Sequence, residues 1–268
     1  MILVTGASGF VGGKILKMRE DALASPSLKA MREDDIRRVL ERFNVDTIIH
    51  TAAISDTRVC QQNPEQSYIA NVELPLYLAR AVKNTGIKLL CFSSDQVYAG
   101  AACEGPFSED MARPGNIYGE HKLEMEERVL DIIPDAVMLR AEWMYDYYLK
   151  KPNYFMNVIN ATDRLSFSRS VYRGLTYVKE VVQNLDGLIR LPGGVYNLGS
   201  ETKKSMYEIT RDFLNLIGKD IPLDDLGGGF NLWMDCSKAK KHGIHFSLVE
   251  EGLKSCAEDY GYIKVNRI

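Results

Sequence analysis

The chain has 268 residues and a formal net charge of −3, with 33 basic and 36 acidic residues interspersed along it. This balance argues against a nucleic acid or an anionic membrane surface as a partner. No apolar run reaches the ~18 residues of a membrane span, no charged leader precedes the first apolar run, and the five cysteines form no C-x-x-C pair. We therefore expect a cytoplasmic protein with no metal site and no disulfide framework.

The chain opens on an apolar strand, residues 1–5, which stops at a cluster of glycines and continues as a short helix. A glycine at position 6 lets the backbone reverse, and the next two glycines allow close approach of a diphosphate and of the helix. The amino end of that helix then faces the anion. The pattern predicts a dinucleotide site whose contacts are Gly6, Ser8, Gly9, Phe10, Val11 and Gly12.

The second strand of such a site is short in this sequence, because only residues 21–26 are available for it. The acid that would bind the adenosine ribose is missing from its end. Side chains that could instead meet a 2′-phosphate lie nearby, namely Arg19, Ser25, Lys29 and Arg32. We therefore predict NADP(H) in preference to NAD(H) as the cofactor.

The next helix and strand lead back to the ligand edge of the predicted sheet. Residues 34–43 have helical periodicity, and an apolar run at 46–53 is typical of a buried parallel strand. Ala52 and Ala53 end this run. Because ligands in such sheets lie at the carboxyl ends of the strands, these small side chains would leave room for a cofactor.

A long helix over residues 64–85 follows, and within it Asn71 could anchor the neighbouring strand. The apolar run at 88–95 predicts another core strand. This strand ends in serines, which places the hydroxyl of Ser94 at the ligand edge of the sheet. A helix cap is the more ordinary use of such a serine.

The helix that runs to about residue 132 carries Tyr118 and Lys122, which share one face because they are four residues apart. A nearby ammonium lowers the pKa of a phenol, so this pair could donate a proton. The same spacing also occurs by chance at Tyr147 with Lys151 and at Tyr260 with Lys264. What distinguishes Tyr118 is its place after the serine-ended strand. His121, on the same helix, is expected to be exposed.

These segments, in this order, resemble the extended short-chain dehydrogenase/reductase family and, within it, the dTDP-4-dehydrorhamnose reductase branch. The resemblance covers nearly the whole chain. The residues that carry it are Thr5-Gly6-x-x-Gly9-x-x-Gly12, Ala52-Ala53, Asn71-Val72, Ser93-Ser94-Asp95-Gln96-Val97-Tyr98, Asn116-x-Tyr118-Gly119-x-x-Lys122, Leu139-Arg140-Ala141-Glu142-Trp143-Met144-Tyr145 and Asp235-Cys236-Ser237-Lys238.

The resemblance implies a role for each matched side chain. Ser94 would be the catalytic hydroxyl that holds the substrate carbonyl, and Tyr118 would be the acid. Lys122 would bind the nicotinamide ribose and lower the pKa of Tyr118, so both residues also count as cofactor contacts. The sugar would lie against Ser94, Asp95 and Trp143, although a core position for Trp143 is nearly as well supported.

The implied activity is reduction of the 4-keto group of a nucleotide-linked deoxysugar by NAD(P)H, with dTDP-4-dehydrorhamnose as the best single substrate. Gln96 stands where the branch usually has an aromatic residue, which affects sugar fit. A dehydratase is disfavoured, since that amide cannot replace the acid of a Thr-Asp-Glu run. An epimerase that retains NAD stays open. So does a non-catalytic NADP-binding subunit like the beta subunit of methionine adenosyltransferase.

The expected fold is a doubly wound parallel α/β sheet of the Rossmann type with a smaller interwoven carboxyl-terminal lobe. Residues 1–145 would form the dinucleotide-binding domain, to which 177–200 return. Residues 146–176 and 201–268 would form the substrate-binding lobe. A small-molecule nucleotide sugar is the expected partner, and a homodimer is possible.

Overall fold

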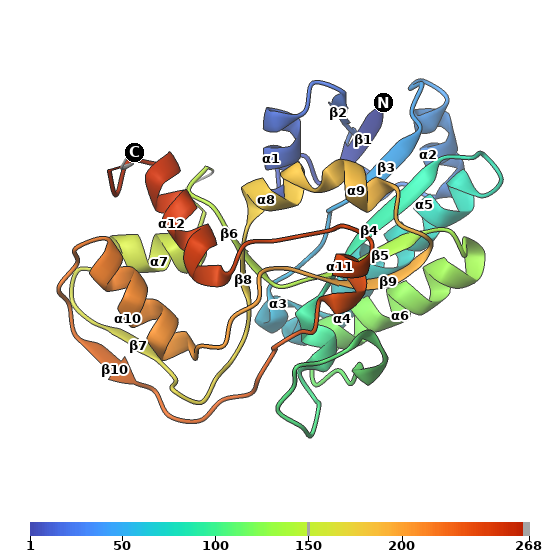
Figure 1. Ribbon diagram of the computed structural model, residues 1–268. Helices are drawn as coiled ribbons and strands as arrows, with labels where there is room; N and C mark the ends of the chain where they lie inside the picture. The colour runs from blue at the N-terminus through green and yellow to red at the C-terminus, as the bar shows by residue number, and fades with distance from the viewer. Residues whose placement is uncertain (149–150, 265–268) are drawn as a thin grey trace.

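The computed structural model describes residues 1–148 and 151–264, and its centre is a six-stranded parallel sheet (Figure 1). The strand order is β2-β1-β3-β4-β5-β9. The order reverses between β1 and β3, the place where open α/β sheets bind ligands. The strands are β1 (Ile2–Thr5), β2 (Ala22–Ala24), β3 (Thr47–His50), β4 (Lys88–Ser94), β5 (Val137–Ala141) and β9 (Gly194–Leu198).

Helices cover both faces of this sheet. One face is packed by α1 (Phe10–Met18), α8 (Val178–Gln183), α9 (Leu185–Ile189) and α11 (Ser237–Lys241). The other is packed by α2 (Glu33–Leu40), α5 (Leu74–Val82) and α6 (Ile117–Ile132). Shorter helical segments in this part of the chain are α3 (Thr57–Gln62), α4 (Pro64–Tyr68), η1 (Ile69–Glu73), η2 (Asp95–Tyr98) and η3 (Glu109–Met111).

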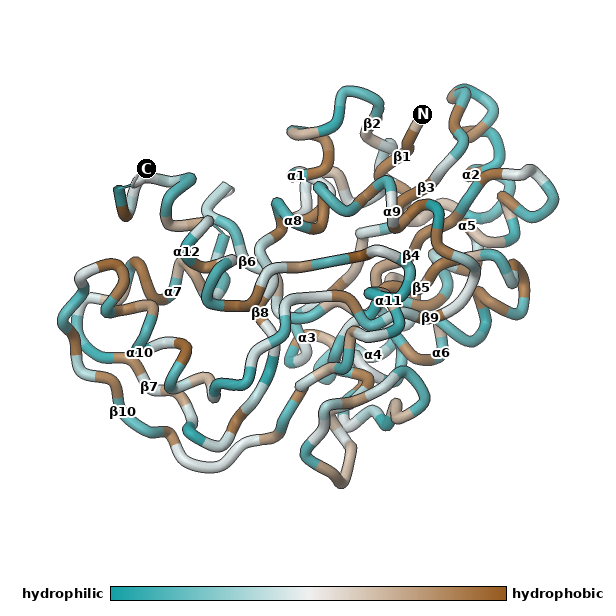
Figure 2. The backbone as a smooth tube through the Cα atoms, in the orientation of Figure 1, coloured by the Kyte–Doolittle hydropathy of each residue, from teal (hydrophilic) through white to brown (hydrophobic). Residues whose placement is uncertain are grey.

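The strands form a two-sided core because alternate residues of a strand point to opposite faces. In β1, Ile2 and Val4 join the cluster under α1 and α8, whereas Leu3 joins the cluster under α2 and α5. Figure 2 shows the resulting hydrophobic colouring along the central strands. Burial on both faces explains why these strands are continuous apolar runs in the sequence.

A smaller lobe stands beside the sheet, on the left of Figure 1. Its aromatic-rich core includes Tyr145, Phe155 and Phe213. The elements of the lobe are β6 (Trp143–Tyr145), α7 (Tyr154–Asn160), β7 (Leu165–Phe167), β8 (Leu175–Tyr177), α10 (Met206–Leu216), β10 (Leu223–Asp225) and α12 (Val249–Asp259). Strand β6 pairs with β8, and β7 pairs with β10.

The lobe contacts the first helix of the sheet domain through a buried ion pair. Lys14 of α1 is 5% exposed, and its Nζ lies 2.7 Å from Oδ2 of Asp146. The same ammonium donates to the hydroxyl of Tyr260 at 3.3 Å, and that hydroxyl donates to Asp146 at 2.6 Å. A buried charge needs such partners, so this cluster joins α1 of the sheet domain to the lobe.

The predicted α/β class and parallel sheet are confirmed, and the second strand is short, with three residues. The helix expected over 64–85 is interrupted by the π-helical turn η1 between α4 and α5. The division into a sheet domain and an interwoven lobe stays a proposal. Residues 149–150 and 265–268 of the proposed lobe lie outside the described residues.

Candidate active site

The glycine turn between β1 and α1 is a tight cradle. Gly6 has φ +71°, and a Cβ there would lie 2.7 Å from the backbone nitrogen of Ala52. A Cβ on Gly12 would lie 2.5 Å from the carbonyl oxygen of Gly6. The turn is closed by the Gly9 amide, which donates to Gly6 at 2.7 Å, and α1 begins at the next residue. This close packing fits a diphosphate held at the amino end of a helix.

The other predicted cofactor contacts surround this turn. Phe10 and Val11 are half-buried at the start of α1, whereas Ser8 is exposed and its carbonyl accepts a hydrogen bond from Lys151 at 2.8 Å. Ala52 and Ala53 follow β3, against the turn. No side chain larger than a methyl group projects from these two positions.

Asn71 fixes the loop that follows these alanines. Its Oδ1 accepts from the Ile54 amide at 3.1 Å, and its Nδ2 donates to the Ile54 carbonyl at 3.0 Å. The side chain is fully buried in the π-helical turn η1. Turns of this kind often occur at functional sites. The expected anchoring role of Asn71 is therefore confirmed.

The start of α6 is held against the end of β4. Asn116 caps the helix by accepting from the Gly119 amide at 2.9 Å, and it donates to Oε1 of Gln96 at 3.0 Å. A Cβ on Gly119 would lie 2.4 Å from the carbonyl oxygen of Gln96. The missing side chain thus lets α6 lie directly on η2, which brings the first turns of α6 to the ligand edge.

This packing brings the three predicted catalytic side chains together. The hydroxyl of Tyr118 lies close enough to that of Ser94, the last residue of β4, for the serine to lower the pKa of the phenol. Nζ of Lys122 lies 5.9 Å from the centre of the Tyr118 ring and donates to the backbone carbonyl of Phe92 at 2.7 Å. All three side chains are buried.

Burial dominates the electrostatics of this group. It lowers the pKa of Lys122 from 10.5 to about 8. It raises the pKa of Tyr118, while the Ser94 hydroxyl acts in the opposite direction. This differs from the lowered phenol pKa that the spacing predicts, because the ammonium faces a carbonyl oxygen rather than the phenol oxygen. Tyr118 is therefore protonated at neutral pH, as an acid must be.

A charged pair borders the site on the side of the lobe. Asp95 is 3% exposed, and its Oδ2 accepts from Nη2 of Arg173 at 2.6 Å. Ser94 donates to the other carboxylate oxygen at 3.1 Å. The guanidinium of Arg173 lies 5.0 Å from the ring of Trp143, which also has an edge contact to Tyr154 at 5.9 Å. Trp143 is half-buried, between the charged pair and the lobe core.

Sequence reasoning missed Arg173. It lies 78 residues after Asp95, in a stretch without a recognisable motif, and only the docking of β8 brings the two together. Its one sequence signal is a basic residue next to a glycine before a short apolar run. His121 also differs from expectation: it is half-buried, and its Nδ1 pairs with the Ser67 hydroxyl at 2.8 Å.

The basic residues near β2 are not equally available to bind a 2′-phosphate. Arg19 is held by Asp21 and Asp186, each at 2.8 Å. Ser25 follows directly after β2, and Lys29 and Arg32 are exposed just beyond it. No acidic side chain follows the carboxyl end of β2 until residue 33.

A sequence model of the family described as RmlD substrate binding domain matches residues 1–223. The chain belongs to this family. It is 28% identical to methionine adenosyltransferase 2 subunit beta of Xenopus laevis over 90% of this chain and 82% of that protein. It is 26% identical to a dTDP-4-keto-6-deoxy-D-glucose reductase of Streptomyces niveus, over 85% and 84% of the two chains.

A solved dTDP-4-dehydrorhamnose reductase of Bacillus anthracis, in complex with NADP, superposes on this RmlD-family chain with a TM-score of 0.83. The match covers 96% of this chain and 98% of that one at 20% identity. At this identity the similarity shows a common fold. It confirms that the sheet is of the Rossmann type.

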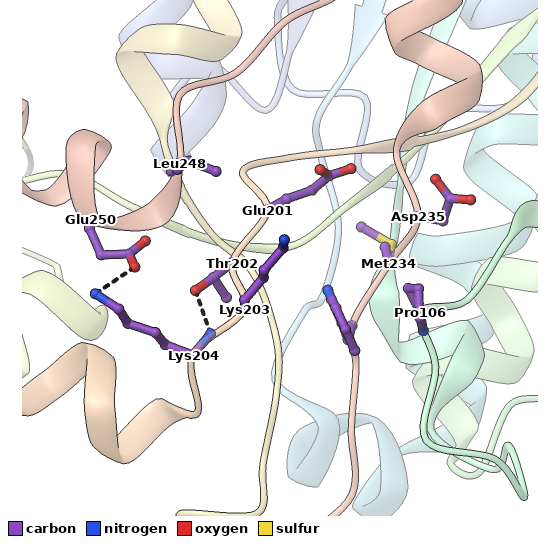
Figure 3. A pocket seen from close by; sticks show the side chains of 10 residues that line it. Pro106, Glu201, Thr202, Lys203, Lys204, Met234, Asp235, Leu248 and Glu250 are labelled. Carbon is purple, nitrogen blue, oxygen red and sulfur yellow. Dashed lines mark hydrogen bonds and ion pairs between the residues drawn. The ribbon is translucent and has the colours of Figure 1, made fainter.

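This RmlD-family chain also has a cavity of about 610 Å³ that none of the predicted cofactor or substrate residues lines. Figure 3 shows Lys204 paired with Glu250 at one end of it and Asp235 near Pro106 at the other. The remaining lining residues are Glu201, Thr202, Lys203, Trp233, Met234 and Leu248.

Among residues 1–148 and 151–264, no helix has the length and apolar character of a bilayer span. Within the same ranges, no group of three or more His, Cys, Asp or Glu side chains is arranged to hold a metal ion.

Proposed function

We propose that this chain is an NAD(P)H-dependent reductase of the 4-keto group of a nucleotide-linked deoxysugar, with dTDP-4-dehydrorhamnose as the first candidate substrate. The observation that carries the proposal is that Tyr118 and Ser94 are near enough for Ser94 to affect the pKa of the phenol, beside the buried ammonium of Lys122. Family membership and the reductase from Streptomyces niveus support the same class. These three side chains are our proposed catalytic residues.

The chain's own groups suit the reduction of a ketone. Ser94 would hold the carbonyl oxygen by donating a hydrogen bond, and the protonated phenol of Tyr118 would deliver a proton to it. Lys122 would hold the nicotinamide ribose, because its ammonium is still charged at pH 7 with a pKa of about 8. A nicotinamide bound along the cradle would supply the hydride.

The cofactor would be held at the glycine turn and along Ala52 and Ala53. We propose that NADP(H) is preferred, because Ser25, Lys29 and Arg32 follow β2 where an acid would otherwise meet the ribose. The sugar would lie between Ser94, Asp95 and the ring of Trp143. Arg173 would complete the polar wall on that side.

The test is turnover of NADPH and NADH with a panel of nucleotide-linked 4-keto sugars, using the parent chain and Tyr118→Phe. General acid catalysis contributes about 10²–10⁴-fold, so kcat of the variant should fall by that order while NADPH binding is retained. Tyr147→Phe is the matched control, since its lysine spacing is read as coincidence, and it should keep the parent kcat. A Tyr118→Phe variant with the parent kcat would refute the mechanism.

A second candidate is a non-catalytic NADP-binding subunit. It is favoured by the methionine adenosyltransferase relative, which matches 90% of this chain. An epimerase is a third alternative on the same side chains, and it would retain NAD through turnover. Net oxidation of NADPH by a 4-keto sugar separates the reductase from both, because neither alternative consumes reduced cofactor.

A further inference from the structure

Glu142 is a buried acid that the proposed reaction does not use. It links β5 to β6, between the sheet and the lobe, and it is 5% exposed. Its Oε2 accepts from the hydroxyl of Thr176 at 2.9 Å. Its Oε1 has no hydrogen-bond partner among the described residues. A buried carboxylate usually has several donors, so a single neutral hydroxyl is poor compensation for a full charge.

Two glycines make the space for this carboxyl group. A Cβ on Gly174 would lie 1.9 Å from Oε1, and a Cβ on Gly199 would lie 2.0 Å from Oε2. Neither glycine has a φ in the left-handed region, so the backbone conformation does not require them. The loops before β8 and after β9 therefore lack side chains where the Glu142 carboxyl lies. The Glu142 carboxyl therefore fills the space that these two glycines leave at the junction between sheet and lobe.

The Glu142 carboxyl shares its surroundings with the charged pair of the site. Arg173 directly precedes Gly174; among the described residues its buried Nε has no hydrogen-bond partner, while its Nη2 binds Asp95. The unpaired donor thus belongs to the residue next to Gly174, the glycine against which the Glu142 carboxyl packs. The titratable and charged groups that face Glu142 from the packed elements are Asp95, Arg173, Glu201 and Cys236.

This arrangement favours the neutral form of the acid. Burial raises the pKa of Glu142 well above its ordinary value, and the carboxylates of Asp95 and Glu201 act in the same direction. The Thr176 hydroxyl and the Arg173 guanidinium oppose this shift. Two buried carboxylates beside one guanidinium would leave an excess negative charge, which a low-dielectric interior tolerates poorly.

We propose that Glu142 is a positioning residue that works as a neutral carboxylic acid. Its proton keeps Arg173 on Asp95, beside Ser94. When the proton is lost, the charged Glu142 competes with Asp95 for the guanidinium and the polar wall of the site is rearranged. That last consequence rests on the proposed function. On a true substrate the KM of the parent should rise relative to that of Glu142→Gln as pH rises through the folded-state pKa of Glu142.

The decisive measurement is unfolding of the whole chain as a function of pH, without any substrate. A folded-state pKa above the ordinary 4.5 means that the native state holds a proton that the unfolded chain has released. The stability contributed by this proton is complete below pH 4.5 and is lost as pH rises through the folded-state pKa. Relative to Glu142→Gln, the folding equilibrium constant of the parent should fall by up to about tenfold per pH unit in that window.

The matched control is Glu201→Gln. This carboxylate lies in the same junction but pairs with Lys240, and its side chain is 31% exposed. The control should still lose stability as pH rises, with the window moved downward because the Glu201 carboxylate contributes to the raised pKa of Glu142. A second measurement is the coupling between Asp95 and Arg173, obtained from a double-mutant cycle of Asp95→Asn and Arg173→Met. The coupling should weaken in the parent as pH rises through the folded-state pKa of Glu142, and it should not show this loss in the Glu142→Gln background.

Equal pH slopes for the parent and Glu142→Gln would overturn the proposal, because Glu142 would then hold no extra proton in the fold. A Glu142→Gln chain that fails to fold would also overturn it, since a neutral amide of the same shape should be tolerated. A coupling that is independent of pH in the parent would remove the link to Arg173. None of these measurements uses a sugar or a cofactor, so their outcome is separate from that of the reductase assay.

Discussion

Replacing Lys122 with methionine should make the protein more stable and abolish its activity. The side chain is 2% exposed, and among the described residues its ammonium has one hydrogen-bond partner, the carbonyl of Phe92 at 2.7 Å. The fall in its pKa from 10.5 to about 8 makes the charged form roughly 3 kcal/mol less favourable in the fold than in the unfolded chain. Methionine fills a similar volume without this penalty.

The gain is partly offset because the Phe92 carbonyl loses its ammonium, at a cost of about 1–3 kcal/mol. We therefore expect Lys122→Met to raise the free energy of unfolding at pH 7 by up to about 2 kcal/mol. Both states of the parent are charged at that pH, so the penalty is fully present. It fades as pH rises above 8, where the folded protein releases the proton first. The difference between the two chains should then shrink between pH 8 and 10.5.

The assay is denaturant unfolding of the parent and Lys122→Met at pH 7 and pH 9.5, with cofactor binding and turnover measured alongside. A destabilisation of 1 kcal/mol or more, estimated here as about the cost of one lost hydrogen bond, would refute the reasoning. It would show that the ammonium stabilises the fold instead of destabilising it. Retained turnover would instead remove Lys122 from the proposed chemistry.

Three further outcomes are expected. Trp143→Ala should raise KM strongly with little change in melting temperature, whereas a pure core aromatic would cost about 3–5 kcal/mol of stability; melting curves beside steady-state kinetics decide between them. NADPH should bind at least as tightly as NADH in fluorescence titrations, and Lys29→Glu should weaken the binding of NADPH but not that of NADH. A clear preference of the parent for NADH would contradict the predicted NADP(H) preference. Gly12→Ala should abolish cofactor binding, because its Cβ would lie 2.5 Å from the Gly6 carbonyl and 2.8 Å from the Thr51 hydroxyl; unchanged NADPH affinity in the same titration would show that the turn is not the cradle.

Local patterns predicted the sheet well because each core strand is buried on both faces and so reads as an apolar run. The order of Ser94 and Tyr118 along the chain also predicted their proximity. Ser94 ends a strand at the ligand edge of the sheet, and Tyr118 lies in the first turn of a helix that begins at the same edge. The π-helical turn at 69–73 was missed. Hydrophobic periodicity does not detect one wide turn, although Pro75, inside the expected helix, is a residue that an unbroken helix accommodates poorly.

Arg173 and Glu142 escaped prediction for a different reason. The environment of each residue is formed by positions distant in the sequence. Arg173 binds Asp95, and the Glu142 carboxyl packs against the glycines at 174 and 199. Neither residue type marks a site by itself. The sequence shows a glutamate beside a tryptophan and an arginine beside a glycine, and only the docking of the lobe brings them to the same junction.

The buried Lys14 also bears on how the chain is made. Its partners Asp146 and Tyr260 emerge from the ribosome 132 and 246 residues later. Until then, burying this ammonium without its partners would be costly. We therefore expect the first helix to reach its final position on the sheet only after these partners are present. During synthesis the amino-terminal half should therefore be incompletely packed and sensitive to proteases. The contacts of Lys14 with Asp146 and Tyr260 should form only after residue 260 has left the exit tunnel.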